Sequence, residues 1–224
     1  MFIKKLYYDF IIFINKIFYK LTIKISEKFF SKIRNRSLKD KKFTIISNNC
    51  WAGYIYRRYG LCYLTPTIGL FIMPKDYIKF CENLKYYLDS ELEFIKPSQS
   101  KYSYEISSID DRFGKYPIGI IDDIEIHFLH YKDKNEAKTK WNRRKKRVNY
   151  DNLLFKFNDQ NGCTEEDLKK FNDLELQGKK ICFTSKSASD KRNVFVKEYS
   201  CYNYVKDDML FSKKYFKIND YFQN

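Results

Sequence analysis

Several polar residues that could do chemistry follow directly after an apolar run near residue 47. The run, Phe43–Ser47, has the β-branched character of a buried strand, and a segment compatible with a helix follows it. In open α/β sheets, ligands bind in the crevice beyond the carboxyl ends of the strands. The sequence therefore predicts a substrate pocket at this point, lined by Ser47, Asn48, Asn49, Cys50 and Trp51.

Cys50 is a candidate catalytic nucleophile. It is expected at the N-terminus of the helix that begins near Asn49, where the helix dipole favours a thiolate. The amide groups of Asn48 and Asn49 could donate hydrogen bonds to an oxyanion or a sugar hydroxyl. Two alternatives stay open, because a free cysteine is often simply buried and asparagines often cap helices.

The two histidines of the chain, His127 and His130, are candidate bases. Residues three apart on a strand point to opposite faces, so at most one of them faces a given pocket unless the strand ends between them. His130 is expected at the strand end, where site residues gather, and is the preferred catalytic base. His127 remains a candidate substrate-binding residue. A core or partly exposed histidine is the alternative for both.

A basic segment from Glu136 to Asn149 suggests phosphate binding. Arg144 and Arg147 are three residues apart, so they share one face of the predicted helix with Trp141. Two guanidinium groups on one face could clamp a phosphate or diphosphate through forked hydrogen bonds. A solvated basic face, with Trp141 in the core, is the alternative.

Several site classes are not expected. The chain has seven glycines and no Gly-rich phosphate loop, and it lacks the G-x-S-x-G nucleophile motif. Its six cysteines form no C-x-x-C pair, which favours reduced thiols, and the histidines have no cysteine at metal-ligand spacing. No metal site and no particular cofactor is therefore expected. Three aspartate pairs could bind a hard metal but are better explained as turns or surface pairs: Asp110-Asp111, Asp122-Asp123 and Asp207-Asp208.

The positive charge is concentrated at the N-terminus. Residues 1–42 hold 12 basic and three acidic residues, and so carry +9 of the net charge of +15. The longest uncharged run in this part is Phe10–Asn15, whereas about 20 apolar residues are needed to span a bilayer. We expect residues 1–41 to form an amphipathic helix on an anionic membrane surface, which places the protein in the cytoplasm, peripheral on the inner membrane. Packing on its own domain or on a second subunit is the alternative.

The remaining chain alternates between strand and helix patterns. This alternation predicts a three-layer α/β domain at residues 42–205, with a mainly parallel sheet and an antiparallel hairpin, followed by a C-terminal extension at 206–224. Besides Phe43–Ser47, strands are expected at 117–121, 124–129, 153–157, 180–184 and 193–198. Helices are expected at 49–59, 75–88, 134–148 and 163–174, and residues 89–115 are expected to be irregular.

The motifs together resemble a bacterial family, the domain of unknown function 1919 family, whose members are associated with exopolysaccharide or capsule biosynthesis. The resemblance spans roughly residues 42–200, with Ala52 where a second Gly is expected. It rests on Ile46–Gly53, Tyr63 with Thr65-Pro66-Thr67, Tyr116–Gly119, Ile126–Phe128 with His130-Tyr131, Glu136-Ala137 with Trp141, Arg144, Arg147 and Asn149, and Phe183-Thr184. It adds Thr65, Thr67 and Asn149 to the candidate substrate-binding residues.

The resemblance implies a transferase that modifies or extends a surface polysaccharide precursor. Acyl or glycosyl transfer onto a sugar or lipid-linked sugar precursor with phosphate would suit the candidate residues, with His130 as base and Arg144 and Arg147 on the phosphate. A non-catalytic scaffold or regulator of a polysaccharide assembly complex is the alternative. Nucleic-acid binding is not expected, because the body of the chain has no nucleic-acid motif and only a mild excess of charge.

Overall fold

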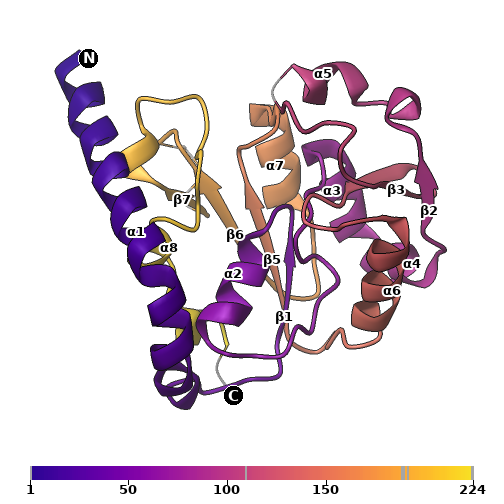
Figure 1. Cartoon of the computed structure of the whole chain (residues 1–224), viewed down its shortest axis with the longest axis horizontal. Helices are drawn as coiled ribbons and strands as arrows, with labels where there is room; N and C mark the ends of the chain where they lie inside the picture. The colour runs from indigo at the N-terminus through magenta and orange to yellow at the C-terminus, as the bar shows by residue number, and fades with distance from the viewer. Residues whose placement is uncertain (1, 109, 188–189, 191, 223–224) are drawn as a thin grey trace.

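The main sheet of the protein has four parallel strands in the order β1-β5-β6-β7 (Figure 1). The computed structural model describes residues 2–108, 110–187, 190 and 192–222. The strands are β1 (Thr44–Ser47), β5 (Leu153–Asn158), β6 (Lys179–Thr184) and β7 (Asn193–Phe195). Because all four run in one direction, their carboxyl ends share one edge of the sheet, and the predicted mixed α/β fold with a mainly parallel sheet is confirmed.

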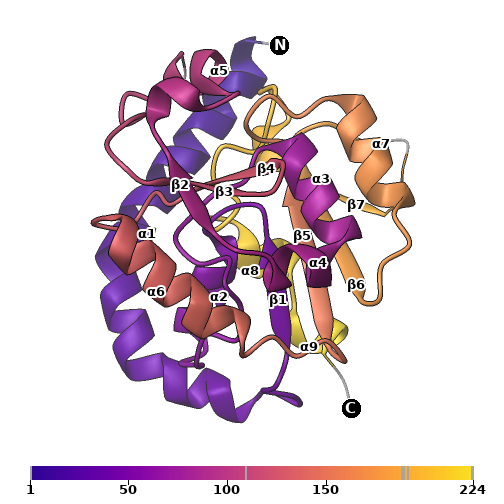
Figure 2. The ribbon, with the colours of Figure 1, turned by 90° about the vertical axis from the view of Figure 1, so that its right-hand side faces the viewer.

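Side chains alternate across the main sheet and build a core on each face. On one face, Phe155 and Phe157 pack with helices α3 (Pro74–Glu82) and α7 (Glu165–Asp173). On the other face, Leu154 packs with helix α2 (Trp51–Arg58) and with both ends of the chain. Figures 1 and 2 show these helices on opposite faces of the strands.

A second, antiparallel sheet follows the order β2-β3-β4. Its strands are β2 (Glu93–Ile95), β3 (Ile118–Ile121) and β4 (Ile124–His127). The predicted hairpin is confirmed, and its turn is closed by Asp122 with a positive φ of 52°. The hairpin pairs with β2 and not with the main sheet. The expected irregular segment therefore contains a strand, which was missed because three residues are too few to show an alternation.

Helix boundaries differ from the predictions where the chain turns early. The helix predicted at 75–88 is two helices, α3 and α4 (Leu84–Asp89), because Asn83 leaves the helical conformation with φ −123° and ψ 43°. Helix α6 (Lys134–Lys145) ends three residues before its predicted end. Helix α7 begins as predicted, since the Thr164 side chain accepts a hydrogen bond from the backbone of Asp167.

Both ends of the chain pack on the α/β body. Helix α1 (Phe2–Arg36) buries Tyr8 and Ile12, and its Asn35 side chain donates a 3.0 Å hydrogen bond to the Tyr59 carbonyl. The C-terminal part contains the short helices η2 (Lys197–Tyr199), α8 (Ser212–Tyr215) and α9 (Ile218–Tyr221). The Phe222 ring stacks on Phe43 at 4.0 Å. The predicted boundaries after residues 41 and 205 therefore do not separate packing units.

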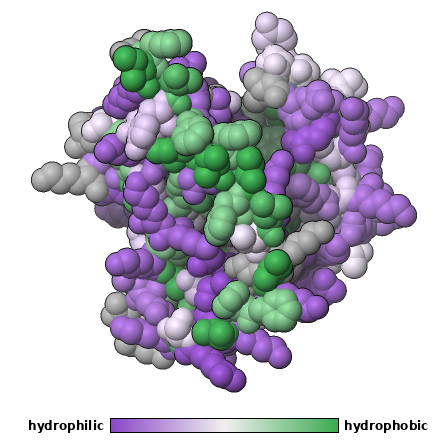
Figure 3. All heavy atoms as spheres, turned by 60° about the vertical axis from the view of Figure 1, so that its left-hand side comes forward, coloured by the Kyte–Doolittle hydropathy of each residue, from purple (hydrophilic) through white to green (hydrophobic). Residues whose placement is uncertain are grey.

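The outer face of α1 carries large apolar side chains that the body does not cover. Residues spaced three and four apart lie on that face, and the Phe10 and Leu21 side chains are 64% and 70% exposed. Figure 3 shows green side chains gathered on this side of the molecule, bordered by hydrophilic ones. No helix in the described part of the chain combines the length and apolar character needed to cross a bilayer.

Candidate functional site

The turn between β1 and α2 carries the polar residues that the sequence predicted to line a pocket, but Ser47 and Asn48 are fully buried and line neither of the two cavities described below. Strand β1 ends at Ser47, and α2 begins at Trp51 with Cys50 as its N-cap residue. The Asn49 side-chain oxygen accepts hydrogen bonds from the Ser47 hydroxyl at 3.2 Å and from the Trp51 backbone N–H at 3.1 Å. These bonds tie the strand end to the first turn of the helix and fix the position of Cys50 between them.

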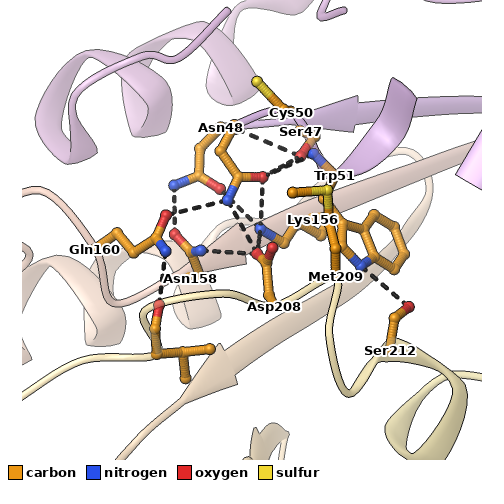
Figure 4. A network of polar contacts seen from close by, with 12 residues as sticks. Ser47, Asn48, Cys50, Trp51, Lys156, Asn158, Gln160, Asp208, Met209 and Ser212 are labelled. Atoms are coloured by element: carbon orange, nitrogen blue, oxygen red, sulfur yellow. Dashed lines mark hydrogen bonds and ion pairs between the residues drawn. The ribbon is translucent and has the colours of Figure 1, made fainter. Parts of the chain in front are cut away.

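A buried ion pair lies next to this turn (Figure 4). Lys156 of β5 is fully buried, and its ammonium group pairs with Asp208 from the C-terminal part of the chain. The ammonium also donates to the side-chain oxygens of Asn48 at 3.3 Å and Asn49 at 3.0 Å. Burial lowers the pKa of Lys156, and the Asp208 carboxylate opposes that shift. The sheet thus places a fully partnered cation under the pocket.

Asp208 connects the strand ends to the pocket. Its Oδ2 accepts hydrogen bonds from Asn158 at 2.8 Å and Asn49 at 3.0 Å, in addition to the ion pair with Lys156. Gln160 extends the network, because its side-chain oxygen accepts from Asn49 at 3.2 Å and its amide donates to the Val205 carbonyl at 2.6 Å. This network holds the C-terminal segment against the carboxyl ends of β1 and β5.

A cavity of about 530 Å³ opens over this network. Its wall combines the end of β1, the turn after β4, the loop after β5 and residues 204–209. The polar and charged residues in the wall are Asn49, Cys50, Asp110, Arg112, His130, Gln160, Asn161, Tyr204, Lys206, Asp207 and Asp208. The tertiary structure therefore brings the predicted catalytic pair, Cys50 and His130, into one cavity.

The protonation states of Cys50 and His130 differ from what a thiolate site requires. Burial, with a smaller contribution from Asp208, raises the pKa of Cys50 to about 11, and its sulfur lies 3.7 Å from the Leu70 carbonyl. The thiol therefore stays protonated at neutral pH, opposite to the expectation from its helix N-terminus. Partial burial lowers the pKa of His130, with Arg112 acting in the same direction, so its imidazole is neutral and able to accept a proton.

His127 lies in the core and has no access to the cavity. Its ring is fully buried and stacks on Phe71 with 4.5 Å between centroids. Burial lowers its pKa to about 3, and neither ring nitrogen has a hydrogen-bond partner within the described residues. Strand β4 ends at His127, so the chain turns before His130. The predicted substrate-binding role of His127 does not fit this placement.

Thr65, Thr67 and Asn149 support β1 and do not line the cavity. The Thr67 hydroxyl accepts a hydrogen bond from the Ser47 backbone N–H at 3.1 Å and donates one to the Ile45 carbonyl at 3.3 Å. These bonds pair two backbone groups on the side of β1 that has no neighbouring strand among the described residues. Thr65 contacts Thr67 at 2.9 Å. The Asn149 backbone N–H donates to Thr44 at the other end of β1. These residues hold β1 in place and so position the turn that follows it.

A second pocket of about 340 Å³ adjoins the cavity and shares Cys50, His130 and Met209 with it. Arg144 lines this pocket, whereas Arg147 lines neither. Because α6 ends at Lys145, the exposed Arg147 side chain lies in the following turn and donates to the Cys62 sulfur at 3.2 Å. The structure therefore does not bring Arg147 to the pocket that Arg144 lines, as the predicted two-arginine clamp requires.

Trp51 also falls outside the cavity wall. Its side chain is fully buried, its indole N–H donates to the Ser212 hydroxyl at 3.2 Å, and its ring packs edge-on against Phe216. It fastens the C-terminal segment to α2 and so holds Asp208 in place indirectly.

Four residues of this network were not expected in the site from the sequence: Lys156, Asn158, Gln160 and Asp208, the last of which was expected in a turn or surface pair. One signal was present, since a lysine interrupts the apolar run of β5 and polar residues follow the strand as they do after β1. Asp208 gave no such signal, because it lies in a segment with no regular pattern.

Three further aspartates of the predicted pairs have structural partners. Asp110 pairs with Arg112 at 2.9 Å, Asp123 accepts from Tyr87 at 2.8 Å, and Asp207 accepts from the Met209 backbone at 3.0 Å. Within the residues that the structure describes, no three His, Cys, Asp or Glu side chains are grouped to hold a metal ion.

Fold and site together define an α/β protein with a polar cavity at the carboxyl ends of parallel strands. The family described as "Domain of unknown function (DUF1919)" matches residues 8–224, and the chain belongs to this family. The match is wider than the expected 42–200 and includes most of α1 and the segment that supplies Asp208. A Haemophilus influenzae protein described as uncharacterized is 31% identical over 198 residues, which cover 86% of this chain and 88% of that protein.

Proposed function

We propose that this protein is a transferase that acts on a sugar precursor of a bacterial surface polysaccharide, by acyl or glycosyl transfer at the inner membrane surface. The observation that carries the proposal is the cavity that holds a neutral imidazole, His130, together with a carboxylate and amides. Carboxylate and amide groups are suited to hydrogen-bond the hydroxyls of a sugar, and a neutral imidazole is suited to accept a hydroxyl proton.

His130 acts as the base in this mechanism. It removes the proton of the acceptor hydroxyl while the sugar oxygen attacks the electrophilic carbon of the donor. The bond from that carbon to the leaving group breaks, and the nucleoside diphosphate or the coenzyme A thiolate departs with the bonding electrons. Asp208 orients the acceptor, since Lys156 and two asparagines engage only its Oδ2 and no described residue donates to its Oδ1. The ion pair with Lys156 keeps this carboxylate in one position, which is the preorganisation that such catalysis needs.

Cys50 has a positional role in this mechanism. Because its pKa is raised to about 11, the thiol is a poor nucleophile at neutral pH. Direct transfer from donor to acceptor therefore fits the cavity better than a covalent intermediate on Cys50.

The test is a transfer assay with the full chain, nucleotide-sugar or acyl-coenzyme A donors and isoprenyl-phosphate-linked sugar acceptors, with products identified by mass spectrometry. His130→Gln should lower the turnover rate about 10²–10⁴-fold, and the wild-type rate should fall as the pH drops and the imidazole takes up a proton. Cys50→Ser should keep most of the activity. An active His130→Gln protein would refute the assignment of the base, and an inactive, folded Cys50→Ser protein would restore the covalent route.

The outer face of α1 supports membrane docking as part of this function. Phe10, Phe13, Ile17 and Leu21 are exposed at helical spacing, and Lys16 and Lys20 lie beside them. Apolar side chains bordered by lysines suit the interface of an anionic bilayer. The face opposite to it, with Tyr8 and Ile12, is already packed on the body, so the membrane would contact only the free side.

Vesicle sedimentation tests this docking. Phe10→Ser combined with Phe13→Ser should lower binding to phosphatidylglycerol vesicles at least about tenfold, because each buried aromatic contributes about 1.5–3 kcal/mol. Tyr86→Ser with Tyr104→Ser is the matched control, since both tyrosines are exposed but lie away from α1. If the protein sediments as a dimer without vesicles, and Phe10→Ser with Phe13→Ser dissociates that dimer, the partner of this face is a second copy of the chain.

The scaffold alternative makes the opposite prediction for the two regions. If the protein only organises an assembly complex, His130→Gln and Asp208→Asn should leave polysaccharide production intact as long as the chain folds. The serine variants of α1 should then abolish it. Loss of production with the folded His130→Gln variant would exclude the scaffold role.

A further inference from the structure

The pocket next to the cavity contains a buried cation without a counter-ion. Arg144, in the last turn of α6, is 6% exposed and lines this pocket. Its Nη1 donates to the Tyr131 hydroxyl at 2.6 Å, and its guanidinium carbon lies 5.0 Å from the centroid of the Tyr63 ring. Its Nε has no hydrogen-bond partner, and no carboxylate among the described residues pairs with it.

Arg144 is held in place by groups that cannot neutralise it. The Tyr131 hydroxyl that receives its hydrogen bond donates in turn to the Ile68 carbonyl at 2.6 Å. Tyr63 covers one face of the guanidinium. The charge is therefore fixed against the pocket wall, with the spare donors of the guanidinium group left for another acceptor.

Two further cations lie in the same wall, Arg57 of α2 and Lys140 of α6. Arg57 contacts Glu27 at 3.3 Å and Lys140 pairs with Glu136, and both side chains are more exposed than Arg144. No aspartate or glutamate is part of the wall itself. A buried charge is costly unless it is paired, so the pocket is electrostatically complementary to an anion.

We propose that this pocket binds the phosphate or diphosphate group of the substrate, with Arg144 as the central ligand and Arg57 and Lys140 at its rim. The planar donor fork of arginine matches phosphate oxygens. The pocket and the larger cavity share Cys50 and His130, so a phosphate bound at Arg144 leaves the attached group next to the proposed base. The placement of a sugar in the cavity rests on the proposed function, whereas the phosphate site rests on the geometry around Arg144.

Binding of phosphate compounds to the full chain tests the site without any transfer assay. The probes are inorganic diphosphate, uridine diphosphate and farnesyl phosphate, followed by calorimetry and by thermal unfolding. At 100 times its dissociation constant, a probe should raise the Tm by about 5–10 °C. Tighter binding of uridine diphosphate would identify a nucleotide-linked donor, and tighter binding of farnesyl phosphate would identify a lipid-linked substrate.

Arg144→Met should remove the Tm shift, and Arg143→Met on the same helix should keep it, because Arg143 is exposed and lines neither pocket. Lys140→Gln at the rim, which leaves the core untouched, should weaken binding severalfold. An equal shift in wild type and Arg144→Met would overturn the proposal, as would no shift with any probe. Binding of diphosphate without any transfer activity would keep the phosphate site and refute the proposed function, so the two failures are distinguishable.

Discussion

Two buried cations near the site, Lys156 and Arg144, have different sets of partners. Lys156 has a carboxylate, Asp208, and two asparagine oxygens around its ammonium group. Arg144 has one tyrosine hydroxyl and no carboxylate within the described chain. The first arrangement is closed and holds three segments of the chain together. In the second, open arrangement the guanidinium has no carboxylate, so it can bind an anion from solution.

His127 shows a third way to bury an ionisable group. Its ring stacks on Phe71, contacts Tyr116 edge-on and lies with Nε2 3.7 Å from the buried Glu125 carboxylate, and burial keeps it neutral. The three buried ionisable side chains therefore have different roles. Lys156 links segments of the chain, Arg144 is available to bind an anion, and His127 packs in the core as a neutral ring. Each function makes a different prediction for substitution.

The largest effect is expected for Asp208→Asn. This change leaves the Lys156 charge buried without a carboxylate, so the free energy of unfolding should fall by about 3–5 kcal/mol. Urea unfolding at neutral pH measures it. Asp111→Asn, at an exposed aspartate, removes the same charge and should change stability by less than about 0.5 kcal/mol.

The double change Lys156→Met with Asp208→Leu should recover most of that loss, because no charge then remains buried. If Asp208→Asn unfolds at the wild-type urea concentration, Lys156 does not depend on its carboxylate. The distinction between the closed and the open cation would then be lost.

A smaller effect, with a defined pH dependence, is expected for His127. Its pKa is about 3 in the folded protein against about 6.5 in the unfolded chain. Between these values only the unfolded chain takes up the proton, so stability falls as the pH drops below about 6.5. At pH 5 the loss should be about 2 kcal/mol, at 1.36 kcal/mol per pH unit.

His127→Phe tests this assignment, because it keeps an aromatic ring next to Phe71 and removes the titration. Urea unfolding at pH 7.5 and pH 5 should show a smaller difference between the two conditions for the variant than for wild type. Equal differences in the two proteins would mean that another group causes the acid sensitivity.

The smallest change in stability is expected for Arg144→Met measured without phosphate. Methionine fills similar space and removes a buried charge that has no carboxylate partner, so the variant should be at least as stable as wild type, by about 0–1 kcal/mol. A loss above about 2 kcal/mol would show that Arg144 is a structural cation like Lys156, which would remove the contrast on which the phosphate site depends.

Local sequence patterns predicted most of the elements of the main sheet. The apolar runs of β1, β5 and β6 were found, as was the start of α7 at Thr164, because alternation and capping act between near neighbours in the chain. The break at Asn83 and the strand β2 were missed, since each depends on what the segment packs against. For the site, the sequence singled out Asn49, Cys50 and His130, and the structure places all three in the wall of one cavity. The catalytic roles of Cys50 and His130 remain predictions.

The sequence by itself determined the α/β class, the polar turn after β1 and the basic, aromatic N-terminal helix, because these follow from periodicity and composition. Only the tertiary structure decided that Asp208 meets Lys156 across 52 residues of chain, that Arg144 is buried while Arg147 is not, and that burial raises the pKa of Cys50. The physical reason is that burial and long-range pairing depend on which segments the fold brings together. A local sequence pattern does not encode contacts between segments that are far apart in the chain.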